Sequence, residues 1–133
     1  MRVFLDTNVL VSAFATRGVS ADVLRVVLAE HTLVTSEVVM GELTRALRAH
    51  IRLPGRIVDE IEAFLREHDV APRPVAPSAL PVRDEDDRWV LASAIAGEAE
   101  VLVTGDRDLL DVASKAPLKI VDPRGFWHLI RKS

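Results

Sequence analysis

The sequence predicts an α/β protein: a three-layer α/β/α sandwich with a central parallel sheet of four to five strands. Short apolar runs alternate along the chain with longer segments whose apolar residues recur at the spacing of one helix face. Such alternation is typical of β-α-β units, in which helices cover both faces of a parallel sheet. Acidic residues follow several of these segments, and the carboxyl ends of parallel strands meet at one edge of a sheet.

The size and composition indicate one folded domain. The chain has 133 residues, of which 49% are hydrophobic, so residues 1–133 are expected to form a single core. The formal net charge of −3 gives no general attraction to nucleic acids, although a local basic patch can still bind them. Cysteine is absent, which excludes disulfides and thiolate metal sites, and the four histidines lack the spacing of zinc ligands.

The start of the chain enters a strand-like run at once and lacks the apolar region and cleavage site of a signal peptide. No apolar stretch is long enough to span a bilayer. We therefore expect a soluble, cytoplasmic protein that does not contact a membrane.

The first half of the chain is expected to begin with a buried strand at residues 2–5 and a short helical turn at residues 8–14. Ser20 has the side chain of an N-cap and precedes a strongly apolar helix. A second strand is predicted at residues 32–35, and Ser36 would cap the helix that follows it.

A third helix is expected after the break at Pro54-Gly55. Its apolar face would consist of Ile57, Ile61, Phe64 and Leu65. A weak strand is predicted at residues 69–72. The four prolines within residues 72–81 then indicate an extended loop, because neither flank is long enough to fold alone as a domain.

Residues 84–97 read as a helix whose inward residues include Trp89 and Ile95. The clearest strand of the chain is predicted at residues 100–104.

A short helix at residues 106–112 and a last strand at residues 118–121 complete the sheet in this prediction. Pro123 has the fixed backbone angle that suits the first turn of a final helix.

Four acidic residues, Asp6, Glu42, Asp87 and Asp106, are the candidates for a functional site. Asp6 and Asp106 come directly after strand-like runs, and the other two border the apolar stripes of predicted helices. Four carboxylates gathered at one sheet edge would repel one another unless protons or cations compensated. Oxygen ligands without cysteine or clustered histidine favour Mg²⁺ or Mn²⁺ over zinc. The pattern therefore points to a divalent-metal site and to hydrolytic or phosphoryl chemistry.

Each acid also has a simpler interpretation. Asp6 and Asp106 have the position of helix N-caps, and Glu42 that of a solvated helix rim. The run from Asp84 to Asp87 resembles a solvated first helical turn, with Asp84 as its N-cap. Only the joint pattern favours a site, because the simple interpretation requires several coincidences at one edge of one sheet.

Four segments resemble, in order and spacing, the PIN-domain family and more closely its VapC-like toxin branch. They are Val3-Phe4-Leu5-Asp6-Thr7-Asn8, the stretch from Ser36 to Leu43, the run from Asp84 to Asp87 that leads into Leu91-Ala92-Ser93-Ala94, and Val103-Thr104-Gly105-Asp106. No single segment is specific, but together they cover almost the whole chain.

The resemblance implies a metal-dependent ribonuclease in which a metal-activated water attacks an RNA phosphodiester in line. By motif position, Asp6, Glu42, Asp87 and Asp106 would form the catalytic and metal-binding quartet. Asp86 competes with Asp87 for the third place, and the register before Ala92-Ser93-Ala94 favours Asp87. The supporting residues would be Asn8, Thr104, Asp84 and Asp108.

RNA binding would require positive side chains near the acids. Arg45, Arg48 and Arg107 are candidates, although each alone also fits a solvated helix face. The resemblance further implies a small antitoxin protein as a partner, and a homodimer. The apolar helices near residues 21–30 and 36–49 could leave a groove for a partner helix, or could simply face the core.

Two other functions fit parts of the pattern. A receiver-like, Mg²⁺-binding signalling domain also carries acids at strand ends, but Lys119 lies at the wrong end of its strand and Glu42 would have no role. A catalytically inactive binding module would not need the complete set of acids.

Overall fold

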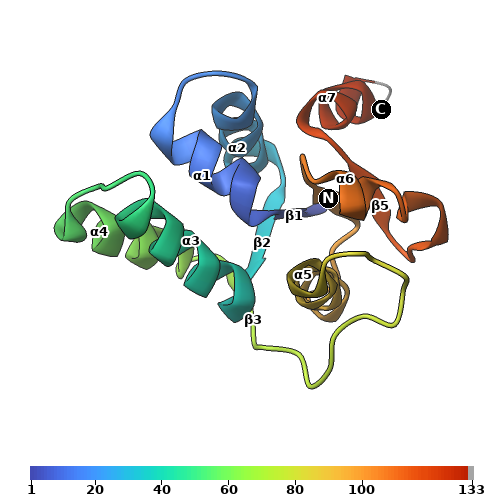
Figure 1. Ribbon diagram of the computed structural model, residues 1–133. Coiled ribbons are helices and arrows are strands. Elements are labelled where there is room, and N and C mark those ends of the chain that lie inside the picture. The colour runs from blue at the N-terminus through green and yellow to red at the C-terminus, as the bar shows by residue number, and fades with distance from the viewer. Residues whose placement is uncertain (132–133) are drawn as a thin grey trace.

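The computed structural model describes residues 1–131, which form a five-stranded, all-parallel sheet with helices on both faces (Figure 1). The strands are β1 (Arg2–Leu5), β2 (Thr32–Ser36), β3 (Asp69–Ala71), β4 (Val101–Val103) and β5 (Lys119–Val121). Their order in the sheet is β3-β2-β1-β4-β5. The predicted three-layer α/β/α architecture with a parallel sheet is confirmed.

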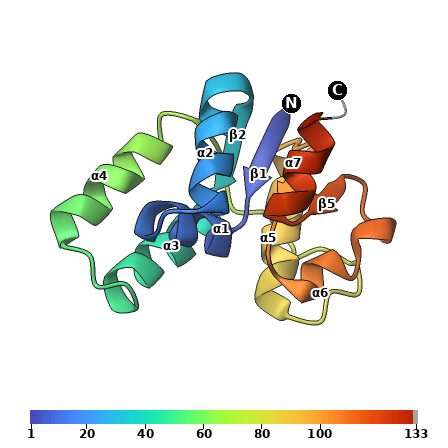
Figure 2. The ribbon, with the colours of Figure 1, turned by 90° about the horizontal axis from the view of Figure 1, so that it is seen from above.

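The helices are α1 (Thr7–Ala15), α2 (Val19–Glu30), α3 (Glu37–Ala49), α4 (Gly55–Leu65), α5 (Glu85–Ala96), α6 (Arg107–Leu110) and α7 (Pro123–Arg131), with a 3-10 turn at Ala113–Lys115. In Figure 1, α5 lies on one side of the sheet, while α1, α2 and α7 lie on the other. Figure 2 shows α1 to α4 on one side of β1 and α6, β5 and α7 on its other side, so the two halves of the chain meet along β1.

The strand order reverses between β1 and β4. From β1 the chain proceeds outward through β2 and β3, crosses back through α5, and continues outward in the opposite direction through β4 and β5. Leu5 is paired with Val103, and the backbone N–H of Asp6 donates to the carbonyl of Val103 at 2.9 Å. In open α/β sheets, the carboxyl ends of the strands beside such a reversal are where ligands bind.

Apart from Arg2 at the start of β1, the two central strands are apolar because both of their faces are covered. Val3, Phe4 and Leu5 of β1 are completely buried, and so are Leu102 and Val103 of β4. Burying each large side chain contributes roughly 1.5–3 kcal/mol. This rigid centre fixes the backbone from which Asp6 and the Thr104–Asp106 segment emerge.

Several local predictions were wrong at helix ends. Residues 8–14 belong to a full helix rather than a short turn. Helix α2 begins at Val19 and not after Ser20, because Gly18, with a φ of 143°, occupies the N-cap position and Ser20 is buried inside the helix. Residues 106–112 do not form one helix, since α6 ends at Leu110 and a 3-10 turn follows.

Two apolar side chains expected to face inward are exposed. Phe64 of α4 and Ile95 of α5 are 37% and 39% exposed, because the apolar stripe of each helix is wider than the surface it packs against. By contrast, Ser36 caps α3 as predicted and accepts from the N–H of Val39 at 3.2 Å. Among residues 1–131, no helix is long and apolar enough to cross a membrane.

Candidate metal centre

Asp6 lies at the centre of the candidate site, directly after β1. One of its carboxylate oxygens caps α1 by accepting from the N–H of Thr7 at 2.7 Å, and the other accepts from the hydroxyl of Thr104 at 2.7 Å. Its side chain is buried, and this burial raises the pKa of Asp6 above 3.8, with a smaller contribution from the charge of Asp106; the two hydrogen bonds oppose the shift. The position therefore costs free energy when the carboxylate is charged.

Thr104 joins Asp6 to the segment after β4. Its buried hydroxyl donates to Asp6 and accepts from the backbone N–H of Asp106 at 2.9 Å. Asp106 in turn caps α6, where its carboxylate accepts from the N–H of Asp108 at 2.9 Å. Thr104 thus positions both the carboxylate of Asp6 and the turn that carries Asp106 and Asp108.

Glu42 reaches the same region from the middle of α3. Its Oε1 accepts from the hydroxyl of Thr7 at 2.5 Å. Partial burial is the main cause that raises the pKa of Glu42; the charges of Asp6 and Asp86 raise it further, while the Thr7 bond and Arg45 lower it. Thr7 therefore links the segment after β1 to α3.

Asp87 has the most perturbed environment of the acids. Its side chain is 8% exposed, and its Oδ2 is buried without a hydrogen-bond partner in residues 1–131. Burial raises the pKa of Asp87 to about 8, together with the contact and charge of Asp106 and the charges of Asp6 and Asp84. Asp86 is exposed, so Asp87 is the member of the pair that points into the acidic region.

Within residues 1–131, Asp87 is the one member of the predicted metal-binding quartet that belongs to a compact group of carboxylates; its neighbours there are two of the predicted supporting residues. Asp84, Asp87 and Asp108 each offer one carboxylate oxygen, and these oxygens lie within 4.8 Å of one another. Asp84 also caps α5 as predicted, accepting from the N–H groups of Asp86 at 2.8 Å and Asp87 at 3.4 Å. All donors are hard carboxylate oxygens, and the Asp87 carboxylate also has a buried oxygen without a hydrogen-bond partner in residues 1–131. These residues fit a hard divalent cation such as Mg²⁺ or Mn²⁺.

Three of the acids cap helices, so helix capping and a role in a functional site are compatible for the same residues. Asp6, Asp84 and Asp106 are the N-caps of α1, α5 and α6. The partial positive charge at the N-terminus of each helix offsets some of the repulsion between the carboxylates. Local capping therefore allows more negative charge to be gathered than the carboxylates alone would tolerate.

The structure brings most of the predicted residues into one connected region. Glu42 is linked to Asp6 through Thr7, and Asp87 is coupled by charge to Asp6 and Asp106. The residues in this region are Asp6, Glu42, Asp84, Asp87, Thr104, Asp106 and Asp108.

Other predicted residues lie apart from these contacts. Asn8 is exposed and, within residues 1–131, its side chain makes no hydrogen bond. Arg48 is paired at 2.7 Å with Asp59 of α4. Arg45 is near enough to Glu42 to affect its charge, and Arg107 is exposed at the start of α6. Thr7 was not predicted, although its place between two motif residues, Asp6 and Asn8, was a signal that it faces the same region.

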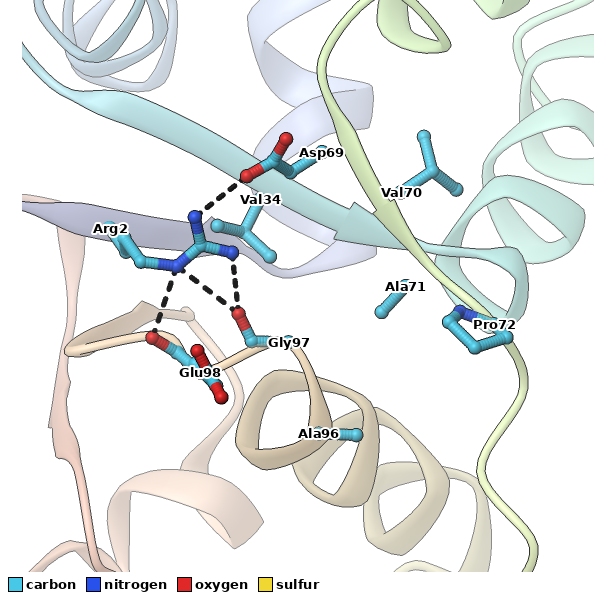
Figure 3. A pocket seen from close by; sticks show the side chains of 9 residues that line it. All are labelled: Arg2, Val34, Asp69, Val70, Ala71, Pro72, Ala96, Gly97 and Glu98. Atoms are coloured by element: carbon cyan, nitrogen blue, oxygen red, sulfur yellow. Dashed lines mark hydrogen bonds and ion pairs between the residues drawn. The ribbon is translucent and has the colours of Figure 1, made fainter.

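The opposite end of α5 holds a different arrangement. A pocket of about 260 Å³ lies there, and the Arg2 side chain crosses it (Figure 3). Arg2 donates to the carbonyls of Gly97 at 2.7 Å and Glu98 at 3.3 Å, and it pairs with Asp69 at 2.7 Å. These bonds attach the carboxyl end of α5 to β1 and β3, and they do not contact the acidic region.

The helices near residues 21–30 and 36–49 were predicted to leave a groove or to face the core. Val23, Leu24 and Val27 of α2 are buried, as are Leu43 and Leu47 of α3. The apolar faces of both helices thus belong to the core.

Comparison with solved structures supports the fold. A chain in the structure of VapBC-1 from nontypeable Haemophilus influenzae matches with a TM-score of 0.65 and 19% identity, covering 93% of this chain and 99% of that one. VapBC2 from Rickettsia felis, bound to a DNA fragment from its promoter, gives 0.61 and 18%, covering 92% and 98%. FitAcB from Neisseria gonorrhoeae gives 0.59 and 18%, covering 95% and 99%.

No curated protein matches the sequence. The family model described as "PIN domain" matches residues 2–108, which is most of the chain and includes every acid of the predicted quartet. The resemblance predicted from the four sequence segments is confirmed, and the chain belongs to the PIN-domain family.

Proposed function

We propose that this chain is a divalent-metal-dependent endoribonuclease that acts in the cytoplasm as the toxin of a toxin–antitoxin pair. The observation that carries the proposal is the cluster of Asp84, Asp87 and Asp108 carboxylates, in which Asp87 also has a buried Oδ2 without a hydrogen-bond partner in residues 1–131. A folded protein gains nothing from such an atom unless a ligand satisfies it. Cations satisfy it best, because every neighbouring donor is a carboxylate.

Asp87, Asp84 and Asp108 would hold the ion, with Asp6, Asp106 and Glu42 completing the negative surface around it. When bound, Mg²⁺ or Mn²⁺ would supply Lewis-acid activation of a phosphodiester and of water. Thr104 fixes the orientation of the Asp6 carboxylate, and Thr7 fixes that of Glu42. Asp87, which is mainly protonated at neutral pH without a cation, would give up its proton when the cation binds.

Neither a cysteine nor a histidine-activated serine is available as a nucleophile at this place. Cysteine is absent from the sequence, and no serine with a matched histidine lies among the residues of the acidic region. Water as the attacking group, and phosphodiester hydrolysis as the reaction, are therefore the chemistry that the side chains favour.

The toxin role is supported by the fold shared with chains from VapBC complexes. A small antitoxin protein and a second copy of this chain are the proposed partners. The receiver-like alternative is disfavoured by topology: receiver domains have the strand order 2-1-3-4-5, whereas this sheet runs β3-β2-β1-β4-β5.

An RNA cleavage assay tests the proposal. Purified protein is incubated with single-stranded RNA in Mn²⁺, in EDTA and, in parallel, as the Asp6→Asn variant. Cleavage is expected only for the parent chain in Mn²⁺, with products that carry 5′-phosphates.

Asp59→Asn, an exposed carboxylate on α4, is the matched control and should cut like the parent. Cleavage that persists in EDTA, or in Asp6→Asn with Mn²⁺, would refute the proposed site.

A further inference from the structure

A second pocket opens beside the acidic region and shares Glu42 with it. Its volume is about 250 Å³, and it lies between α3, α5 and the loop that follows β3. The lining residues are Val38, Glu42, Arg45, Arg73, Asp86 and Trp89. A molecule in this pocket would contact the same glutamate that borders the candidate metal centre.

The pocket contains an aromatic surface already covered by a cation. The guanidinium carbon of Arg73 lies 4.3 Å from the centre of the Trp89 ring, which is the geometry of a cation–π contact. Within residues 1–131, neither Arg73 nor Arg45 forms an ion pair, and both side chains are exposed. Two unpaired positive charges therefore stand beside one flat ring.

These features match the chemistry of an unpaired nucleobase. Bases of single-stranded RNA stack on aromatic rings and on arginine planes, and their phosphates bind arginine. Aromatic residues make up only 5% of the sequence and tyrosine is absent, so the Trp89 ring is not one of many such surfaces. Because Trp89 lines the same pocket as Glu42, a base bound there would lie next to the proposed cleavage site.

Asp86 adds a preference among bases. It is an exposed carboxylate on the pocket wall, and a carboxylate accepts hydrogen bonds from the exocyclic amino groups of cytosine and adenine. Uracil has no amino group and offers a carboxylate only its ring N3–H, which is flanked by two carbonyl oxygens that the carboxylate repels. The wall therefore favours amino-bearing bases.

We propose that this pocket binds one unpaired, amino-bearing base of the RNA next to the cleaved bond, stacked on the guanidinium plane of Arg73, which itself lies on Trp89, and selected by Asp86. The inference rests on the proposed ribonuclease function, which it sharpens. Arg45, which lines the pocket together with Glu42, contacts the phosphate that connects the bound base to the cut site. Trp89 and Arg73 supply affinity, while Asp86 supplies selectivity.

Binding without cleavage tests the pocket separately from the nuclease activity. The sequence has two tryptophans, so Trp127→Phe leaves Trp89 as the only one. Hexamers of adenine, cytosine or uracil ribonucleotides are titrated in EDTA while tryptophan fluorescence is recorded. We expect quenching, with adenine and cytosine hexamers bound roughly tenfold more tightly than the uracil hexamer. If Trp127→Phe does not fold, loss of the signal in Trp89→Phe, compared with the parent, gives the same information.

Two variants assign the roles, and Arg124→Gln on α7 is the matched control. Asp86→Asn should bring the three affinities together, because an amide both donates and accepts. Arg73→Gln should weaken all three, and in the cleavage assay it should raise KM more than it lowers kcat. Equal binding of the three hexamers by the parent, or an unchanged KM in Arg73→Gln, would overturn the inference. Base-selective quenching without any Mn²⁺-dependent cleavage would instead support the pocket and reject the nuclease.

Discussion

The two ends of α5 are built in opposite ways. At the carboxyl end, unlike charges meet: the Arg2 guanidinium donates to the carbonyls of the two residues that follow the helix and pairs with Asp69 (Figure 3). Gly97 lets the helix approach β2 so closely that a Cβ there would lie 2.8 Å from Cγ1 of Val34. The charge of Arg2 is therefore matched by partners within the protein, and these contacts stabilise the fold.

At the amino end, like charges meet. Asp84 and Asp87 face Asp106 and Asp108, one oxygen of Asp87 has no partner in residues 1–131, and its pKa is raised to about 8. This end costs folding free energy until a proton or a cation binds. Because one helix joins the two ends, the bonds of Arg2 at the carboxyl end also help to hold the amino end in place, despite the repulsion between its carboxylates. The residues at the carboxyl end of α5 therefore stabilise the fold, whereas those at its amino end suit the binding of a ligand.

The largest effect is expected for Asp87→Asn. Removing a carboxylate of the proposed metal site should lower Mn²⁺-dependent cleavage by about 100-fold or more. At pH 8.5 and without metal, the free energy of unfolding should stay equal or rise, because a repelled charge is removed. Urea unfolding and initial cleavage rates measure the two quantities. A clear loss of stability would mean that Asp87 serves the fold.

Arg2→Met should have the opposite effect, lowering the stability of the fold while changing cleavage little. Loss of the charge-assisted bonds to the end of α5 should destabilise the protein by roughly 1–3 kcal/mol, as measured by urea unfolding. Well below the melting temperature, cleavage by the folded fraction should change little. Arg2→Lys keeps the charge but not the fork of donors, and should recover only part of the loss. An unchanged free energy of unfolding in Arg2→Met would show that the bonds of Arg2 do not stabilise the fold.

The stability of the metal-free protein should depend on pH through the acidic amino end of α5. The pKa of Asp87 is about 8 in the folded protein and near 3.8 when unfolded, so the folded state binds more protons between these values. The favourable contribution is complete below pH 4 and is lost as the pH rises to about 8. Melting temperatures of the parent should therefore fall relative to those of Asp87→Asn between pH 5 and pH 9. Parallel curves would contradict the raised pKa.

The smallest effect is expected for Thr7→Val. It removes the hydroxyl that donates to Glu42 and should cost about 0.5–1.5 kcal/mol of stability. Mn²⁺ affinity should fall by roughly tenfold, because Glu42 loses its orientation. Thr7→Ser retains the donor and serves as the control in thermal melts and metal titrations. Equal metal affinity in Thr7→Val and Thr7→Ser would remove Glu42 from the site.

The sheet and the acids were predictable because both follow from local pattern. Apolar runs such as Val101-Leu102-Val103 predict buried parallel strands, and Asp6 and Asp106 follow such runs directly. Asp84 was predictable as an N-cap because capping needs only its own helix.

Details that depend on tertiary contacts were not predictable. The sequence favoured Asp87 but left Asp86 as its rival, because the choice depends on how α5 is rotated in the fold. The Arg73–Trp89 contact depends on the path of the loop after β3. Likewise, Thr7 was missed because its partner, Glu42, lies on a helix that only the folded sheet brings near. Exposed Ile95 and Phe64 show the same limit, since periodicity gives a face but not the area that covers it.

Isothermal titration of Mn²⁺ into the metal-free protein tests the central claim most directly. The acidic end of α5 should make the parent and Arg2→Met take up the ion with similar stoichiometry, while Asp87→Asn should show little or no uptake. Absence of uptake by the parent, or equal uptake by Asp87→Asn, would contradict the assignment of these carboxylates to a cation.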